Sequence, residues 1–276
     1  MDKSLKAACI GEFIGTGLII FFGAGCVAAA QVAGATFGLW EISIVWGLAV
    51  AMAVYASAGL SGAHLNPAVT IALWKFACFD GKKILPYIIS QMLGAFCAAA
   101  LVYFLYKDLF AASEAAQNIV RGEGVGFAGV FSTYPNPHIS VLQAFFVEVV
   151  ITAVLMALIF ALTDDGNGLP RGAMAPLLIG LLIATIGGAM APLLIGLLIA
   201  TIGGAMGPLT GFAMNPDRDF GPKLFAFLAG WGDIALTGGR DIPYFLVPIF
   251  GPIVGALLGG FIYTRVIGKN LPCNLK

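Results

Sequence analysis

The sequence predicts an all-α membrane protein with six transmembrane helices and two re-entrant half-helices arranged as an inverted repeat. Of its 276 residues, 60% are apolar and 10% are charged, against roughly 25% charged in an ordinary soluble domain. Several apolar runs reach the roughly 20 residues that a helix needs to cross a bilayer. Two shorter apolar segments each begin with Asn-Pro, and the two halves of the chain repeat one plan. We therefore expect a single domain over residues 1–276, with the lipid bilayer as its main solvent.

The apolar runs between polar breaks define the expected spans. They lie at residues 7–30, 42–60, 84–106, 140–162, 173–206 and 244–266. The first run is longer than a signal-peptide core, so we expect it to remain as a span. Six spans put both termini on one side of the membrane. Cytoplasmic termini would give that face nine of the 14 Lys and Arg residues and leave five elsewhere, including Arg218 and Lys223, which favours this orientation.

Two segments are too short to cross the bilayer and are typical of half-helices. One begins at Asn66-Pro67-Ala68 and runs to about residue 76; the other begins at Asn215-Pro216-Asp217 and runs to about residue 228. Asn is a favoured N-cap and Pro suits the first helical position, so each dipeptide predicts a helix start. Non-helical backbone at membrane depth is tolerated where protein buries it or where it lines an aqueous cavity. We expect the loops before the two half-helices, residues 61–65 and 209–214, to be such stretches.

The two halves, at about residues 5–107 and 139–268, each place a Glu before the Asn-Pro motif. Glu12 precedes Asn66 by 54 residues, and Glu148 precedes Asn215 by 67. The excess has a visible cause, because residues 173–188 and 189–204 are the same sixteen letters. Three spans in each half would invert the second half relative to the first, with the working site near the midplane. We expect one copy to complete the fifth span and the other to be extruded, to extend a helix or to be poorly ordered.

Charge and cysteine usage exclude several function classes. The net charge is zero and the sequence has no basic run, so nucleic acid is not an expected partner. The five cysteines form no Cys-x-x-Cys pair, and no metal-ligand spacing stands out, so we expect no cofactor and no metal. No nucleophile and base arrangement typical of an enzyme is present either. The sequence predicts that the protein is not an enzyme.

Two longer motifs carry a specific resemblance. The segments SGAHLNPAVTIALW at residues 61–74 and TGFAMNPDRDFGP at residues 210–222 resemble the signature loops of the aquaporin superfamily, also called the major intrinsic proteins. The segment EFIGTG at residues 12–17 resembles the first-span motif of that family, and Asp219 after Arg218 resembles its bacterial glycerol-facilitator branch. The resemblance implies passive diffusion of glycerol, other small neutral solutes and some water. It also implies a homotetramer in the bacterial inner membrane with one pore per subunit.

The expected pore follows from physics as well as from the resemblance. Two half-helices that meet head to head put two positive dipole ends at the pore centre, which repels cations. Asn66 and Asn215 can each turn a side-chain NH2 toward the lumen while their other groups cap the helix. Arg218 lies three residues after Asn215, and an arginine in a membrane is costly unless it faces water or a partner. We expect it to line the pore and bind two hydroxyls; the alternative is an outer-surface arginine paired with Asp219 or Asp217.

The resemblance also assigns a selectivity filter and the surroundings of the pore loops. Trp46 and Phe212 resemble the aromatic corner of the filter, which faces the arginine, and Gly203 resembles the small residue that leaves room there. Taken alone, either aromatic residue would suit lipid or core packing, and Gly187 is the counterpart of Gly203 in the other copy. The resemblance implies that Glu12 and Glu148 brace the two loops; the alternative is a proton-relay pair. The carbonyl groups implied to line the pore belong to Gly62, Ala63, His64, Gly211, Phe212 and Ala213.

Asp217 departs from the family pattern, which has a small residue after the second Asn-Pro. A carboxylate in the first turn of a helix is stabilised by the helix dipole. A negative charge near the midplane would offset the barrier to cations, so the sequence predicts lower conductance or looser cation exclusion. Two other functions stay open at this point: a water-selective aquaporin with a tighter filter, and a secondary transporter built on inverted repeats.

Overall fold

The computed structural model describes residues 3–164 and 190–271. Within these residues, six helices are long and apolar enough to cross a membrane. They are α1 (Lys3–Val32), α2 (Leu39–Ser61), α4 (Ile84–Gln117), α5 (Val141–Thr163), α7 (Met190–Thr210) and α10 (Leu246–Ile262). The prediction of six membrane helices is confirmed. The helix α4 runs past its expected end at residue 106, because the Lys and Asp that follow interrupt the apolar run without interrupting the helix.

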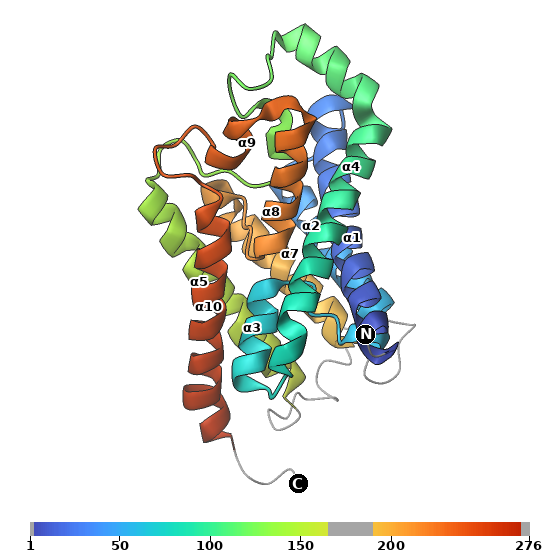
Figure 1. Ribbon diagram of the computed structural model, residues 1–276. Coiled ribbons are helices and arrows are strands. Elements are labelled where there is room, and N and C mark those ends of the chain that lie inside the picture. The colour runs from blue at the N-terminus through green and yellow to red at the C-terminus, as the bar shows by residue number, and fades with distance from the viewer. Residues whose placement is uncertain (1–2, 165–189, 272–276) are drawn as a thin grey trace.

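The two half-helices are α3 (Pro67–Phe76) and α8 (Pro216–Ala226). Figure 1 shows them along the axis of the bundle, with α8 toward the end that carries α9 and α3 toward the opposite end. The helix α1 begins and α10 ends at the end of the bundle where α3 lies (Figure 1). The short helices therefore enter the bundle from opposite sides, as the inverted repeat requires.

Shorter elements connect the spans. They are the 3-10 helices η1 (Gly81–Lys83), η2 (Gly126–Val130) and η6 (Gly268–Asn270), the π-helices η4 (Phe227–Trp231) and η5 (Tyr263–Ile267), and the helix α9 (Asp233–Thr237). Side chains and glycines mark several of the helix ends. Ser140 caps α5 by accepting a hydrogen bond from the backbone N–H of Gln143, and α2 ends at Gly62 in the left-handed conformation.

Glycines at the helix crossings let the long helices approach each other closely. A Cβ atom on Gly94 of α4 would overlap the carbonyl oxygen of Phe13 in α1, and one on Gly255 of α10 would overlap that of Val149 in α5. Gly47 of α2 and Gly196 of α7 face each other in the same way. Small residues at crossings allow the backbone contacts that stabilise helices in lipid, where the hydrophobic effect between helices is weak.

The duplicated segment is described in part. The second copy, residues 189–204, supplies most of α7, from Met190 onward. The first copy, residues 173–188, lies outside the described residues. The expectation that one copy is extruded, extends a helix or is poorly ordered therefore also falls on residues that the structure does not describe. The expected start of the fifth span at residue 173 and the counterpart glycine Gly187 also lie outside them.

Candidate functional site

The two pore loops have the same backbone conformation, residue for residue. Positive φ angles occur at Gly62 (82°), Ala63 (52°) and Leu65 (52°), and at Gly211 (76°), Phe212 (44°) and Met214 (50°). Non-glycine residues adopt the left-handed region at a cost of roughly 1–2 kcal/mol each. The composition of the loops does not predict this conformation, because four of the six residues carry a side chain. The surrounding contacts must therefore hold both loops in place.

Two asparagines cap the half-helices and join them. The side-chain oxygen of Asn66 accepts a hydrogen bond from the backbone N–H of Ala68, and that of Asn215 accepts from Asp217 and Arg218. The side-chain nitrogen of Asn66 donates to the carbonyl oxygen of Met214 at 2.8 Å, and that of Asn215 donates to Leu65 at 2.7 Å. Each amide uses one hydrogen on the opposite loop, and its second hydrogen remains for an oxygen in the lumen.

Two buried glutamates bind the backbone of the two loops. Glu12 of α1 accepts hydrogen bonds from the N–H groups of His64 (2.9 Å) and Leu65 (2.7 Å). Glu148 of α5 accepts from those of Ala213 (3.0 Å) and Met214 (2.8 Å). Both carboxyl groups are fully buried. This geometry fits a brace better than a proton relay, because each carboxylate binds N–H donors of its own loop and holds the strained backbone.

Each glutamate has one further partner, which the sequence reasoning did not identify. The side chain of Gln91 in α4 donates to Glu12 at 2.6 Å and to the hydroxyl of Thr70 at 3.2 Å. The hydroxyl of Thr210 donates to Glu148 at 2.6 Å. A buried glutamine in the third span was a signal that could have indicated the first of these contacts, because polar side chains in spans are usually paired.

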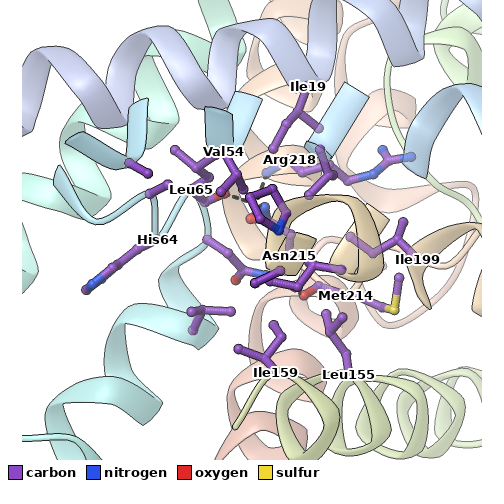
Figure 2. Close-up of a pocket in the computed structure, with 18 of the residues that line it drawn as sticks. Ile19, Val54, His64, Leu65, Leu155, Ile159, Ile199, Met214, Asn215 and Arg218 are labelled. Carbon is purple, nitrogen blue, oxygen red and sulfur yellow. Dashed lines mark hydrogen bonds between the residues drawn. The ribbon is translucent and has the colours of Figure 1, made fainter. Parts of the chain in front are cut away.

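One cavity of about 470 Å³ lies along the inner faces of the two loops. Figure 2 shows Asn215 and Met214 among apolar side chains, with Ile19 and Val54 on the side of Leu65 and Arg218, and with Leu155 and Ile159 on the opposite side. The lining therefore combines backbone and amide groups of the two loops with hydrocarbon from α1, α2, α5 and α7. Such a lining suits a neutral solute that has one polar face and one apolar face.

A second cavity, of about 320 Å³, lies beyond the first and shares three residues with it. Trp46, Phe212 and Arg218 line both cavities. The second cavity is otherwise lined by residues of the segment 125–134, including Ser132 and Thr133, and by Val27, Ile42 and Gly211. The three shared residues therefore form the boundary between the two compartments, which is the place expected for a filter.

The arginine at this boundary differs from the expected arrangement. The resemblance implied that Trp46 and Phe212 face Arg218 across the filter. In the structure, the guanidinium carbon of Arg218 lies over the Trp46 ring, 3.9 Å from its centroid. The alternative pairing of Arg218 with Asp219 is not observed either, because Asp219 binds other groups. Nη1 of Arg218 is buried without a hydrogen-bond partner among the described residues, and Arg218 is one of the residues that line both cavities.

Gly203 and Gly207 of α7 make room for the ring of Phe212. A Cβ atom on Gly203 would lie 2.9 Å from Cζ of Phe212, and one on Gly207 would lie 3.1 Å from its Cδ1. The structure thus places Gly203 against Phe212, and the space beside this glycine is occupied by the aromatic side chain.

A buried ion pair lies directly behind the filter. Asp219 accepts hydrogen bonds from the backbone N–H and the hydroxyl of Thr133, at 2.6 and 2.7 Å. Lys223 donates to Asp219 at 2.6 Å and to the carbonyl oxygen of Thr133 at 2.7 Å. Both charged side chains are fully buried, so Lys223 is not the surface charge that the orientation argument counted. The i,i+4 spacing of Asp219 and Lys223 was the available sequence signal.

Asp217 lies outside both cavities. It is 4% exposed, and its Oδ2 atom has no hydrogen-bond partner among the described residues. The expected effect on cation exclusion needs a carboxylate that faces the lumen, and the residues that line the two cavities do not include Asp217. Pro67, Ala68 and Pro216 are buried beside the two asparagines, at the starts of the half-helices.

The two histidines lie in different settings. Nδ1 of His64 is 3.2 Å from the hydroxyl of Thr70, and its ring packs against Phe79 and Tyr87. His138 lies in the loop before α5, where its backbone N–H donates to the side-chain oxygen of Asn136. In the part of the chain that the structure describes, no group of three His, Cys, Asp or Glu side chains could hold a metal ion.

Comparison with known proteins gives one family throughout. A family model described as "Major intrinsic protein" matches residues 2–190 and 184–263, two ranges that overlap across the junction of the duplicated copies. A "Glycerol uptake facilitator protein" of Haemophilus influenzae is 70% identical over 276 residues, which cover 99% of this chain and 98% of the relative. One of Escherichia coli (strain K12) is 67% identical over 275 residues, covering 99% and 92%. A "Propanediol uptake facilitator PduF" of Citrobacter freundii is 60% identical over 276 residues, covering 99% and 97%.

One solved structure extends the comparison to three dimensions. It is described as the "X-ray structure of the aquaglyceroporin from Plasmodium falciparum", and it matches with a TM-score of 0.79 and 32% sequence identity. The match covers 96% of this chain and 98% of that one. The arrangement of spans and half-helices is therefore shared by a protein whose sequence differs at most positions.

Proposed function

We infer, because the chain belongs to the major intrinsic protein family, that it is a passive membrane channel for glycerol. Other small neutral solutes and some water pass through the same pore, and no solute is chemically changed. The observation that carries the inference is the mixed polar and apolar lining of the cavity between the two loops, together with the position of Arg218 at its boundary. A polyol presents carbon-bound hydrogens on one side and hydroxyl groups on the other, which matches this lining.

The pore selects by shape, hydrogen bonding and electrostatics. Trp46 and Phe212 contact the carbon face of the solute, and Arg218 donates to its hydroxyl groups. Farther in, Asn66 and Asn215 donate to the next oxygen, and the loop carbonyls accept from hydroxyl groups. The carbonyls that take this role belong to the residues just before each asparagine: Gly62, Ala63, His64, Gly211, Phe212 and Ala213.

Cations are excluded at the centre of the pore. The N-termini of α3 and α8 meet at the two asparagines, so the positive ends of both helix dipoles lie there. The fixed charge of Arg218 adds a second barrier at the filter. Glu12 and Glu148 do not offset these barriers at close range, because their carboxylates lie behind the loops and bind backbone N–H groups.

The rest of the proposal concerns assembly and orientation. Residues 1–276 form a single channel domain, with one inverted half at about residues 5–107 and the other at about 139–268. The protein is a homotetramer with one pore per subunit, in the bacterial inner membrane, with both termini cytoplasmic. The positive charge on the proposed cytoplasmic face supports the orientation.

Stopped-flow light scattering of proteoliposomes tests the function. In an inward glycerol gradient, vesicles that contain the protein should shrink and then reswell much faster than empty vesicles, with a rate that does not saturate with glycerol. Replacing Arg218 by Ala removes the filter donor and should change the ratio of glycerol to water permeability. A channel that passes water but not glycerol would contradict the proposal, and so would a saturable, ion-coupled flux, which is typical of a transporter.

A further inference from the structure

We propose that Gly23 of α1 determines the selectivity of the pore by setting the position of the Trp46 indole. The proposal rests on the filter role of Trp46 given above. Gly23 is buried, faces neither cavity as a lining residue, and lies far from the two signature loops in the sequence. Any side chain at position 23 would displace the indole of Trp46.

A side chain at Gly23 would occupy the space of the indole. A Cβ atom built there would overlap the ring atoms Cη2, Cζ3 and Cε2 of Trp46. The atoms Cζ3 and Cε2 lie across the six-membered ring from each other. A carbon that overlaps both must therefore lie over the face of the ring, so the indole packs flat on the backbone of α1.

The second face of the indole is occupied by the filter arginine. The guanidinium carbon of Arg218 lies 3.9 Å from the ring centroid, and the backbone at Gly23 already covers one face. The guanidinium must therefore lie over the other face. Trp46 is therefore held between the backbone of α1 on one face and the cation of Arg218 on the other. These two contacts fix the position of the ring along the direction perpendicular to its plane.

The arrangement gives the indole one direction in which to move. A methyl group at position 23 pushes the ring away from α1 and toward Arg218, which lines both cavities together with Trp46. Both filter groups then shift into the lumen at its boundary. Because interiors are close-packed, an added carbon is not absorbed without such a shift. The channel should narrow most for solutes that are wider than water.

The test compares Gly23→Ala with Gly25→Ala. The two glycines lie on the same helix, but a Cβ on Gly25 meets nothing within 4 Å, so Gly25→Ala is a matched control for the effect of alanine in α1. Purified variants are reconstituted in proteoliposomes, and glycerol and water permeabilities are measured by light scattering. We expect Gly23→Ala to lose glycerol permeability by roughly tenfold or more, since one methyl group in a fitted pocket discriminates on this scale. Water permeability should fall less, and Gly25→Ala should match the unmodified protein.

A second pair of variants separates the filter from general packing. In the Trp46→Phe background the ring is smaller, so adding Gly23→Ala should change the glycerol-to-water ratio much less than it does beside the indole. If Gly23→Ala fails to fold, recovery of folding in the double variant supports the same contact. The proposal is overturned if Gly23→Ala leaves the ratio unchanged, or if the ratio changes equally with Trp46 and with Phe at position 46.

The outcomes also distinguish this proposal from the proposed function. An unmodified protein that does not pass glycerol contradicts the function itself. An unmodified protein that passes glycerol, together with an unchanged Gly23→Ala variant, contradicts the role of Gly23 alone.

Discussion

The two re-entrant units share one backbone but bury different side chains. Both have a glycine and two further left-handed residues before the asparagine, and both bind a glutamate from a long helix. The helix α3 carries its one charge at Lys75, near its end and exposed. The helix α8 buries Asp217, Arg218, Asp219 and Lys223. The asparagines and the buried glutamates are thus common to both units, whereas buried charges on the half-helix itself belong to the second unit alone.

The features that the two halves share and the features that only the second half has therefore serve different functions. The features that both halves share, the opposed helix starts and the asparagine contacts, create a barrier at the midplane that is the same from either side. The filter draws its arginine and one aromatic ring from the second unit, at one end of the pore. The repeated features therefore form the barrier to cations. The residues that differ between the two halves, in the proposed filter, determine the preference among neutral solutes. Substitutions in both units test this division.

The largest effect is expected where the two halves are alike. Glu12→Ala and Glu148→Ala should each destabilise the protein severely and abolish flux. Glu148→Ala leaves three buried donors without a partner, and Glu12→Ala leaves two and removes one of the two acceptors of Gln91, at about 1–3 kcal/mol per lost donor contact. Unfolding in detergent, followed by circular dichroism, measures the loss for both variants. If one variant keeps its stability and the other unfolds, the two glutamates do not have equivalent roles in holding their loops.

The next effect belongs to the second half alone. Lys223→Met leaves the buried carboxylate of Asp219 without its counter-charge and should cost about 3–5 kcal/mol of unfolding free energy. Thr133 loses a donor to its carbonyl oxygen as well. The matched control is Lys75→Met on α3, where the side chain is exposed and the cost should stay within about 0.5 kcal/mol. Equal losses for the two variants would show that the ion pair contributes nothing beyond the removal of a lysine.

Much of this scaffold could be predicted from sequence because its signals are local. Apolar runs of sufficient length predicted the six spans, and the Asn-Pro dipeptides predicted both half-helix starts within a residue. The end of α4 was wrong because Lys107 and Asp108 were taken as a membrane boundary and therefore as the end of the helix. Alanine, leucine and glutamate after them favour helix, so α4 continues to Gln117.

The rest of the site depends on contacts between distant parts of the chain. The left-handed backbone at Ala63, Leu65, Phe212 and Met214 has no local sequence signal, since it is held by hydrogen bonds from other helices. The stacking of Arg218 on Trp46 joins residues far apart in sequence, and so does the contact of Gly23 with the same ring. Resemblance could assign these residues to a filter, but it could not give the packing that positions them.

A smaller effect tests which duplicated copy forms α7. Gly196 contacts Gly47 so closely that a Cβ at position 196 would overlap the carbonyl oxygen of Gly47. Gly196→Leu should therefore cost about 1–3 kcal/mol by overpacking and reduce flux. Gly180 is the counterpart of Gly196 in the first copy and has the same flanking letters. Gly180→Leu should leave stability and flux unchanged, and the reverse result would assign the fifth span to the first copy.

The smallest effect is expected at Asp217, where the two halves differ at equivalent positions. The counterpart in the first unit is Ala68, which is fully buried. Asp217→Ala removes a buried oxygen that has no partner among the described residues, so it should stabilise the protein by about 1–3 kcal/mol. The reverse change, Ala68→Asp, should destabilise it by a similar amount.

Asp217→Ala also tests whether the carboxylate of Asp217 is buried in the protein or faces the pore lumen. Since Asp217 lines neither cavity, Asp217→Ala should leave potassium and proton leak through proteoliposomes unchanged. A leak that falls in this variant would mean that the charge acts on ions in the pore, as the sequence predicted, and that the side chain reaches the lumen. An unchanged leak with raised stability would show that the second unit tolerates the acid as a packing defect. The cation barrier would then depend on the shared helix starts and on Arg218.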